Sequence, residues 1–278
     1  MSFKNADEKQ VPSPQSPVPK IAASDFDGTI YRGEEISDED LTAIKNWRAA
    51  GNKFGIVTGR AYVMLEPHLK NYNLDVDFSI CCNGAIIYDG GGKIVFETEV
   101  PKNFLVDVMN EPCAQKTLHY AFEAADKVFC VIVSENSWVL RESKRWLFPV
   151  NFIDAAQVST FTKKINQIAL DFPSPDEAQA AADILNAKFG EKIFAQKNTH
   201  SLDIVPAGVN KSSGVENLLR LMNWSGAKVF VVGDETNDLP MIRTFGGFTV
   251  ATAKDFVKRE ATAIFDSVGD MLNNFRDA

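Results

Sequence analysis

Residues 20–33 read KIAASDFDGTIYRG, and the interpretation of the whole chain starts from this stretch. The small and apolar residues 21–24 are typical of a buried strand, and two acids, Asp25 and Asp27, stand at its exit, followed by Gly28 and Thr29. A single acid at that place could cap a turn. Two acids on alternate positions before a glycine indicate instead a metal ligand or a nucleophile.

The composition of the 278-residue chain is that of an ordinary globular protein, with 45% hydrophobic and 24% charged residues. A net charge of −8 argues against nucleic acid or an anionic membrane as a partner, because both favour basic surfaces. No apolar run approaches the ~20 residues of a membrane-spanning helix. The first 20 residues also lack the apolar segment of a secretory signal. We therefore expect a soluble cytoplasmic protein, and nothing in the sequence indicates its oligomeric state.

A regular alternation of strands and helices begins at Lys20, after a proline-rich segment, 1–19, that we expect to be a disordered tail. Ser37 is placed to cap a helix, and a strand over 53–57 and an apolar run over 78–82 follow. Strand, helix and strand recur at 202–205, 212–222 and 228–233. This order predicts an α/β core, a doubly wound, Rossmann-like parallel sheet built from residues 20–84 and 201–278.

The segment 85–200 has a different pattern. A hairpin turn stands at 89–92, apolar stretches follow at 117–122, 128–133 and 165–172, and a helix is predicted from Pro175 to Phe189 with Gly190 as its stop. Hairpins followed by a late helix favour a separate α+β unit inserted into the sheet domain.

Polar clusters follow the predicted parallel strands, at the edge of the sheet where ligands of open α/β proteins bind. Each cluster alone is explained by a turn or a helix cap. Together they would bring up to four carboxylates into one place, which requires a cation, and hard oxygen ligands favour Mg²⁺. A lysine, a threonine hydroxyl and the backbone N–H groups of glycine turns at the same edge suit a phosphoryl group. The residues concerned are Asp25, Asp27, Thr58, Gly59, Lys211, Asp234, Asn237 and Asp238.

These motifs resemble those of the haloacid dehalogenase superfamily. DFDGT at 25–29, the threonine of TGR at 58–60, Lys211 and GDETND at 233–238 match its four motifs in order. The branch resembled is that of the Cof-type phosphatases, in which a large α/β cap is inserted between the second and third motifs, and segment 85–200 has the size of that cap. The resemblance covers residues 20–278. Ser212 is a departure, because a glycine commonly follows the lysine in the family.

The resemblance implies a role for each matching residue. Asp25 would be the nucleophile and a Mg²⁺ ligand, and Asp27 the general acid and base with its backbone carbonyl on the metal. Asp234 would be the third metal ligand, and Asp238 would support the metal shell. The phosphoryl group would be bound by Thr58 and neutralised by Lys211, with Asn237 contacting the phosphate or the lysine.

The function implied is a Mg²⁺-dependent phosphatase that hydrolyses a small phosphorylated metabolite, with a sugar phosphate as the leading class. A phosphotransferase such as a phosphohexomutase is an alternative with the same core. A non-catalytic phospholigand-binding module is a second alternative, and it would leave Asp27 and Lys211 without a task. In the inserted segment, Arg141, Lys144 and Arg145 either meet an anionic part of the substrate or form a solvated surface, which is the more common role of such a cluster.

Overall fold

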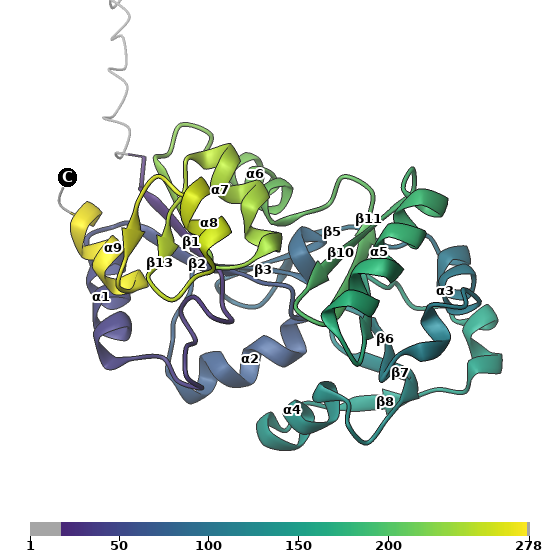
Figure 1. The fold of residues 1–278 in the computed structure, drawn as a ribbon. Coiled ribbons are helices and arrows are strands. Elements are labelled where there is room, and N and C mark those ends of the chain that lie inside the picture. The colour runs from purple at the N-terminus through teal and green to yellow at the C-terminus, as the bar shows by residue number, and fades with distance from the viewer. Residues whose placement is uncertain (1–17, 277–278) are drawn as a thin grey trace, which may run out of the picture.

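The first of two main sheets forms the core of the molecule. The computed structural model describes residues 18–276, so the predicted tail lies almost entirely outside the described part of the chain. The strand order is β12-β1-β2-β3-β4-β5, and β12, β1, β2 and β3 run parallel while β4 and β5 are antiparallel additions. Figure 1 labels β1, β2, β3 and β5 of this sheet. The bounds are β1 Ile21–Ser24, β2 Lys53–Val57, β3 Phe78–Cys81, β4 Ile86–Asp89, β5 Ile94–Glu97 and β12 Val229–Val232.

Helices cover both faces of this sheet, as a doubly wound fold requires. Ala22 of β1 belongs to the apolar cluster that contains Trp47 of α1, and its neighbour Ala23 belongs to the cluster that contains Leu218 of α6. Adjacent strand residues point to opposite faces, so the two clusters lie on the two sides of the sheet. The helices are α1 Asp38–Ala49, α2 Tyr62–Asn71, α6 Lys211–Leu221, α7 Leu239–Phe245, α8 Asp255–Glu260 and α9 Val268–Arg276, with a small parallel pair formed by β13 Thr249–Val250 and β14 Ile264–Phe265.

The cap of α1 is the one that the sequence predicts. The Ser37 hydroxyl accepts the N–H of Asp40 at 3.1 Å, which satisfies a donor that the first helical turn leaves without a partner. Gly51 follows the end of the helix at φ +85°, a conformation that glycine adopts without steric cost.

The second sheet has the order β10-β11-β9-β6-β7-β8 and carries the remaining helices. The elements from α3 to β11 are called the inserted unit below. Its strands are β6 His119–Glu123, β7 Val128–Val133, β8 Val150–Phe152, β9 Gln167–Asp171, β10 Ile193–Asn198 and β11 Ser201–Pro206, and its helices are α3 Asn103–Met109, α4 Trp138–Trp146 and α5 Pro175–Phe189. The prediction for α5 is confirmed at both ends.

Sheet membership contradicts the predicted boundaries at 85 and 200. The hairpin of β4 and β5 extends the first sheet, because β4 pairs with β3. The strand predicted at 202–205 lies in the second sheet instead of the core, because β11 pairs with both β10 and β9. A short apolar strand has no feature that specifies its partner, so the sequence could not assign either strand to its sheet.

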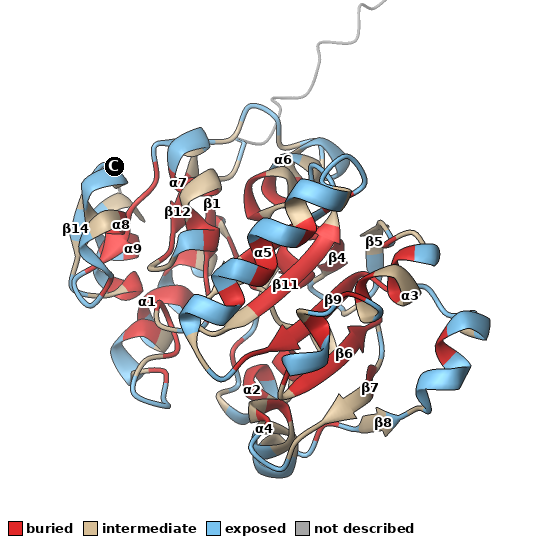
Figure 2. Ribbon diagram, turned by 45° about the vertical axis from the view of Figure 1, so that its right-hand side comes forward, coloured by how far each residue is buried: buried red, intermediate tan, exposed pale blue. Residues whose placement is uncertain are grey.

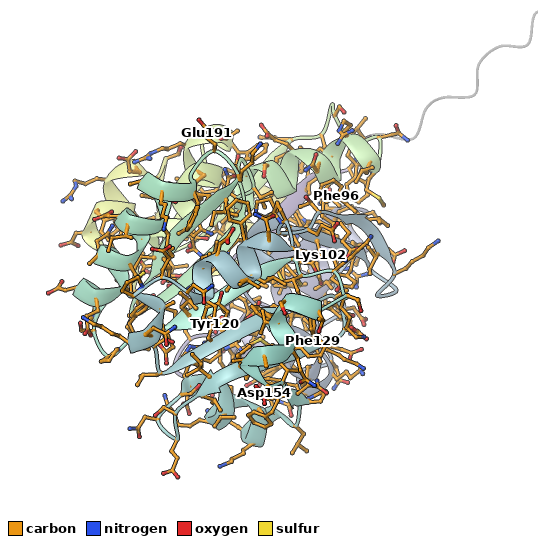
Figure 3. The ribbon with its side chains drawn as sticks, turned by 90° about the vertical axis from the view of Figure 1, so that its right-hand side faces the viewer. Phe96, Lys102, Tyr120, Phe129, Asp154 and Glu191 are labelled. Carbon is orange, nitrogen blue, oxygen red and sulfur yellow. The ribbon has the colours of Figure 1, made fainter. Side chains whose placement is uncertain are left out.

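The second sheet has one apolar face and one polar face. Tyr120, Phe122 and Leu170 belong to a cluster with residues of α3 and α5, such as Leu105 and Leu185. Figure 2 shows β6, β9 and β11 buried beneath helices whose outer surfaces are exposed. Figure 3 looks at the inserted unit from the side and labels Tyr120 and Phe129 of this sheet. The alternate residues of the same strands therefore face the core.

His119 of β6, on the face of the second sheet that is turned toward the core, makes the stability of the protein depend on pH. It is buried with Nδ1 2.8 Å from the Ser137 hydroxyl oxygen, and burial lowers its pKa from 6.5 to about 3. The unfolded chain therefore binds the proton more tightly than the folded one, so stability that is present above pH 6.5 is lost as the pH falls toward 3. At pH 5 this loss is about 2 kcal/mol.

Urea unfolding at pH 7 and pH 5 measures this effect. We expect His119→Gln to lose about 2 kcal/mol less than the wild type between the two pH values, because glutamine does not titrate. An equal loss in the two proteins would contradict the assignment.

No helix among residues 18–276 is long and apolar enough to cross a membrane.

Candidate active site

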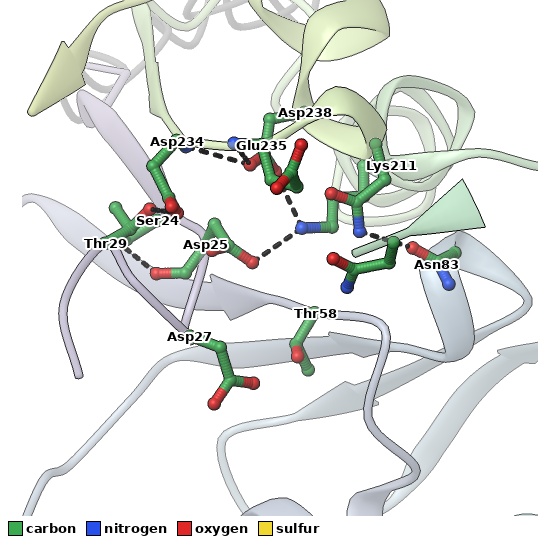
Figure 4. Close-up of polar contacts among 12 residues, drawn as sticks. Ser24, Asp25, Asp27, Thr29, Thr58, Asn83, Lys211, Asp234, Glu235 and Asp238 are labelled. Atoms are coloured by element: carbon green, nitrogen blue, oxygen red, sulfur yellow. Dashed lines mark hydrogen bonds and ion pairs between the residues drawn. The ribbon is translucent and has the colours of Figure 1, made fainter. Parts of the chain in front are cut away.

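Asp25 and Lys211 form the centre of the site. Asp25 directly follows β1 and is buried, and its N–H donates to the Val232 carbonyl at 2.9 Å. Lys211 is the first residue of α6, and its Nζ lies 2.5 Å from Asp25 Oδ1 and 2.6 Å from Asp238 Oδ1 (Figure 4). One buried ammonium thus pairs with two carboxylates, which leaves the group with excess negative charge.

Three carboxylates are close enough to share one cation. Oxygens of Asp25, Asp234 and Asp238 lie within 4.8 Å of one another. Burial, followed by the charge of Asp238, raises the pKa of Asp25 well above its usual value, and burial raises the pKa of Asp234 to about 6. Excess negative charge held away from water is the condition that a divalent cation relieves, and an all-oxygen donor set is what Mg²⁺ prefers. The residues present therefore fit the predicted metal.

Gly28 and Thr29 position Asp234. The Thr29 hydroxyl donates to Asp234 Oδ1 at 2.6 Å. Gly28 has φ +84°, and a Cβ at this position would collide with the Asp234 carboxylate. The glycine of the DFDGT motif is therefore required both by its backbone conformation and by the close approach of this side chain.

Asp238 holds the loop that follows β12. Its Oδ2 accepts the N–H groups of Asp234 and Glu235, both at 2.9 Å, while Oδ1 binds Lys211. Both oxygens of Asp238 therefore already have partners within the chain, and the residue fixes the loop that carries Asp234.

Asp27 lies outside the carboxylate cluster and points away from Lys211 in Figure 4. Both of its oxygens accept hydrogen bonds from Arg60 at 2.7 Å, in a bidentate pair. Burial alone would raise the pKa of Asp27, but the charge and hydrogen bonds of Arg60 outweigh it and hold the pKa below its usual value. Arg60 also reaches Glu142 of α4, 3.4 Å from Nη1 to Oε2, and so connects the two parts of the molecule.

The other predicted residues lie around the same place. Thr58 Oγ1 accepts the Arg60 N–H at 3.1 Å, and the Gly59 carbonyl accepts from Gln167 Nε2 at 2.9 Å. Asn237 donates its amide to Asn83 Oδ1 at 3.1 Å instead of contacting the lysine. The structure thus brings all the residues predicted from the strand ends to one edge of the sheet.

A cavity of about 540 Å³ lies between this edge and the inserted unit. The core side contributes Asp25, Asp27, Gly28, Thr58, Gly59, Arg60, Asp234, Glu235, Asn237 and Lys254. The inserted unit contributes Glu123, Trp138, Gln167, Asn198, Thr199, His200, Ser201 and Asp203. The volume suits a small metabolite.

The basic cluster of α4 does not line this cavity. Arg145 pairs with Glu34 at 2.9 Å, and the Arg141 guanidinium donates to the Asn136 carbonyl at 2.6 Å. The interpretation of this cluster as a surface feature therefore agrees with the structure, and the interpretation as a binding site for an anionic substrate group does not.

The roles of Thr29 and Arg60 in positioning Asp234 and Asp27, and one wall of the site, were not predicted. Thr29 and Arg60 stand in the quoted motifs, and their polar side chains beside Gly28 and Gly59 were the available signal. The wall formed by the inserted unit depends on strand pairing that brings residues 123, 167 and 203 together. The sequence signals this wall only through the segments HYAFE at 119–123 and QIALD at 167–171, in which small or polar residues alternate with large apolar ones.

The fold and the site define a doubly wound α/β protein with a buried cluster of carboxylates at the edge of its core sheet. The family model of the haloacid dehalogenase-like hydrolases matches residues 22–270. The chain belongs to this family.

Relatives and solved structures extend this result. The pyridoxal phosphate phosphatase YbhA of Escherichia coli is 25% identical, over 92% of this chain and 97% of its own. The 5-amino-6-(5-phospho-D-ribitylamino)uracil phosphatase YcsE of Bacillus subtilis is 24% identical, over 89% and 90%. A HAD/COF-like hydrolase from Plasmodium vivax has the same fold, with a TM-score of 0.79, 22% identity and 94% and 96% coverage. The family and these relatives place the chain among the phosphoric monoester hydrolases.

Proposed function

We propose that the protein is a Mg²⁺-dependent phosphatase that hydrolyses a small phosphorylated metabolite, with sugar phosphates as the first candidates, through an aspartyl phosphate on Asp25. One observation carries the proposal: a buried carboxylate paired with Lys211 opens into a cavity of metabolite size beside further carboxylates. The names of the relatives, which act on small phosphorylated compounds, support the same class.

The reaction proceeds in two steps on residues of this chain. In the first, an Asp25 oxygen attacks phosphorus, the bond to the leaving oxygen breaks, and Asp27 gives that oxygen a proton. In the second, Asp27 takes a proton from a water molecule that attacks the aspartyl phosphate, which frees Asp25 and inorganic phosphate. The bidentate contact with Arg60 orients the Asp27 carboxyl and favours its ionised form. Asp27 therefore takes up a proton from solvent before the first step, and it is ionised again when the second step begins.

The charge on the phosphoryl group is balanced by the surroundings. Lys211 supplies a buried positive charge, and Thr58 and the backbone N–H of Gly59 supply donors. Asp25 and Asp234, with the backbone carbonyl of Asp27, would hold Mg²⁺, and Asp238 would stand behind them. The ion, when bound, neutralises negative charge on the carboxylates and on the phosphoryl oxygens.

We propose that the inserted unit acts as a cap over the site. Its connections to the core sheet lie after β5 and after β11, and the Arg60–Glu142 contact joins the two parts. Movement about these connections would admit substrate and exclude water from the aspartyl phosphate. On composition alone we also propose a cytoplasmic location.

Release of inorganic phosphate from a panel of phosphorylated metabolites, with Mg²⁺ and without an acceptor sugar, tests the function. Hydrolysis of at least one member at a rate that depends on Asp25 supports a phosphatase. A phosphohexomutase would instead isomerise its sugar phosphate and release little phosphate. A non-catalytic module would bind members of the panel and release none.

A further inference from the structure

The face of the second sheet that borders the cavity carries a polar pattern that the phosphoryl chemistry does not use. Glu123 of β6 stands opposite Gln167 of β9 in the strand register, and Asp203 of β11 stands opposite Ala169. Ala169 is in turn opposite Ala121. Both alanines are buried in an apolar cluster and do not line the cavity, whereas Glu123, Gln167 and Asp203 do.

Glu123 and Asp203 each have one oxygen bound and one oxygen unused. Gln167 Nε2 donates to Glu123 Oε2 at 2.9 Å, and Asn83 Nδ2 donates to Asp203 Oδ2 at 2.9 Å. Within the described residues, no donor lies within hydrogen-bond distance of Glu123 Oε1 or Asp203 Oδ1. Glu123 is 3% exposed and Asp203 8%, and both line the cavity. Both side chains line the cavity, so a ligand bound there could donate hydrogen bonds to these two oxygens.

The basic side chains that line the cavity, among residues 18–276, already have partners. Arg60 binds Asp27 and Glu142, Lys254 binds Glu235, and His200 Nδ1 lies 2.7 Å from Asp171 Oδ1. The wall opposite the phosphoryl site therefore presents acceptors with no spare positive charge. A second phosphate or a carboxylate on the substrate would lie beside Asp203 and Glu123 with no unpaired basic side chain of the cavity, among residues 18–276, to balance it, which disfavours its binding.

We propose that Glu123 and Asp203 form a specificity site for the leaving group, which selects a monophosphate bearing hydroxyl or amino donors and rejects one with a second anionic group. This inference rests on the proposed function, and it adds the residues of the cap that read the substrate and the chemical class that they accept. Gln167 and Asn83 orient the two carboxyls. Burial raises the pKa of Glu123 to about 8 and that of Asp203 to about 6, and donors from a ligand would relieve the same desolvation.

Paired substrates test the specificity site. The variants are Glu123→Gln and Asp203→Asn, which keep the size of each side chain and replace one carboxyl oxygen by an amide nitrogen. The substrates are the best hydroxyl-bearing monophosphate of the panel, its bisphosphate counterpart, and p-nitrophenyl phosphate, whose leaving group has no donor. We expect each variant to lower kcat/KM for the monophosphate roughly tenfold to a hundredfold, the effect of losing a charge-assisted hydrogen bond. Turnover of p-nitrophenyl phosphate should stay within about twofold.

Glu111→Gln is the matched control. Glu111 is a buried carboxyl of the inserted unit paired with Lys188, and it does not line the cavity. Glu111→Gln should leave the ratio of kcat/KM for the monophosphate to kcat/KM for p-nitrophenyl phosphate unchanged. The inference is overturned if the wild type prefers the bisphosphate. It is also overturned if the Glu123 and Asp203 variants lose kcat/KM equally for the hydroxyl-bearing monophosphate and for p-nitrophenyl phosphate.

A binding measurement separates this inference from the proposed function. Calorimetry with Mg²⁺ and the uncleaving Asp25→Asn protein compares the monophosphate with inorganic phosphate. We expect Glu123→Gln in that protein to weaken binding of the monophosphate at least about tenfold and to leave phosphate binding unchanged. If no phosphate ester is hydrolysed but this difference is found, the phosphatase proposal fails and the specificity site stands. If Glu123→Gln changes the affinity of the Asp25→Asn protein for neither the monophosphate nor inorganic phosphate, the specificity site is wrong.

Discussion

Asp25→Asn is expected to reduce phosphate release at least about 10⁴-fold while the protein stays folded, because loss of a nucleophile removes the covalent route altogether. The amide fills the same space at the end of β1 but does not attack phosphorus. Initial rates with the best substrate of the metabolite panel, measured with saturating Mg²⁺, provide the comparison.

Stability measurements show whether such a loss is chemical. Asp25 shares Lys211 with Asp238, and burial together with the charge of Asp238 raises its pKa. Removing one of the two charges leaves the Lys211–Asp238 pair intact, so the melting temperature without Mg²⁺ should be unchanged or higher. Asp270→Asn, at an exposed carboxyl of α9, controls for the loss of one charge. A folded Asp25→Asn protein with more than a tenth of wild-type activity would contradict the nucleophile assignment.

Removal of divalent cations is expected to abolish activity, and Mg²⁺ is expected to restore it. The clustered oxygens of Asp25, Asp234 and Asp238 carry more negative charge than Lys211 can balance. Without a cation, this charge would also repel the phosphoryl group. Chelation followed by titration of Mg²⁺ gives the concentration at which activity is half-maximal.

Asp234→Ala extends the same titration. Asp234 is the cluster member held by Thr29, and its loss should raise the half-maximal Mg²⁺ concentration at least about tenfold. The Asp270→Asn protein should titrate like the wild type. Full activity in excess chelator, or an unchanged requirement in Asp234→Ala, would show that the carboxylates have another purpose.

The sequence by itself determined the core fold and the chemical centre. Local signals sufficed for the helices, since the hydroxyl of Ser37 and the prolyl start at Pro175 act within one turn of the chain. The centre was also predictable, because parallel strands place their carboxyl ends at one edge. Asp25 and Asp234 follow the parallel strands β1 and β12, so these two residues meet there although they are far apart in sequence.

Only the tertiary structure decided how the second sheet is assembled and what it presents to the site. The hairpin of β4 and β5 was predicted in the inserted unit but lies in the core sheet, and β11 was predicted in the core sheet but lies in the second sheet. Strand pairing depends on partners remote in sequence, so the sequence did not indicate either assignment. The same pairing sets Glu123 beside Gln167 and brings Asp203 to the cavity. The Arg60 contacts with Asp27 and Glu142 likewise need both parts of the molecule in place. Periodicity shows which residues share a face of a strand, but a strand's neighbours are chosen by the packing of the whole chain.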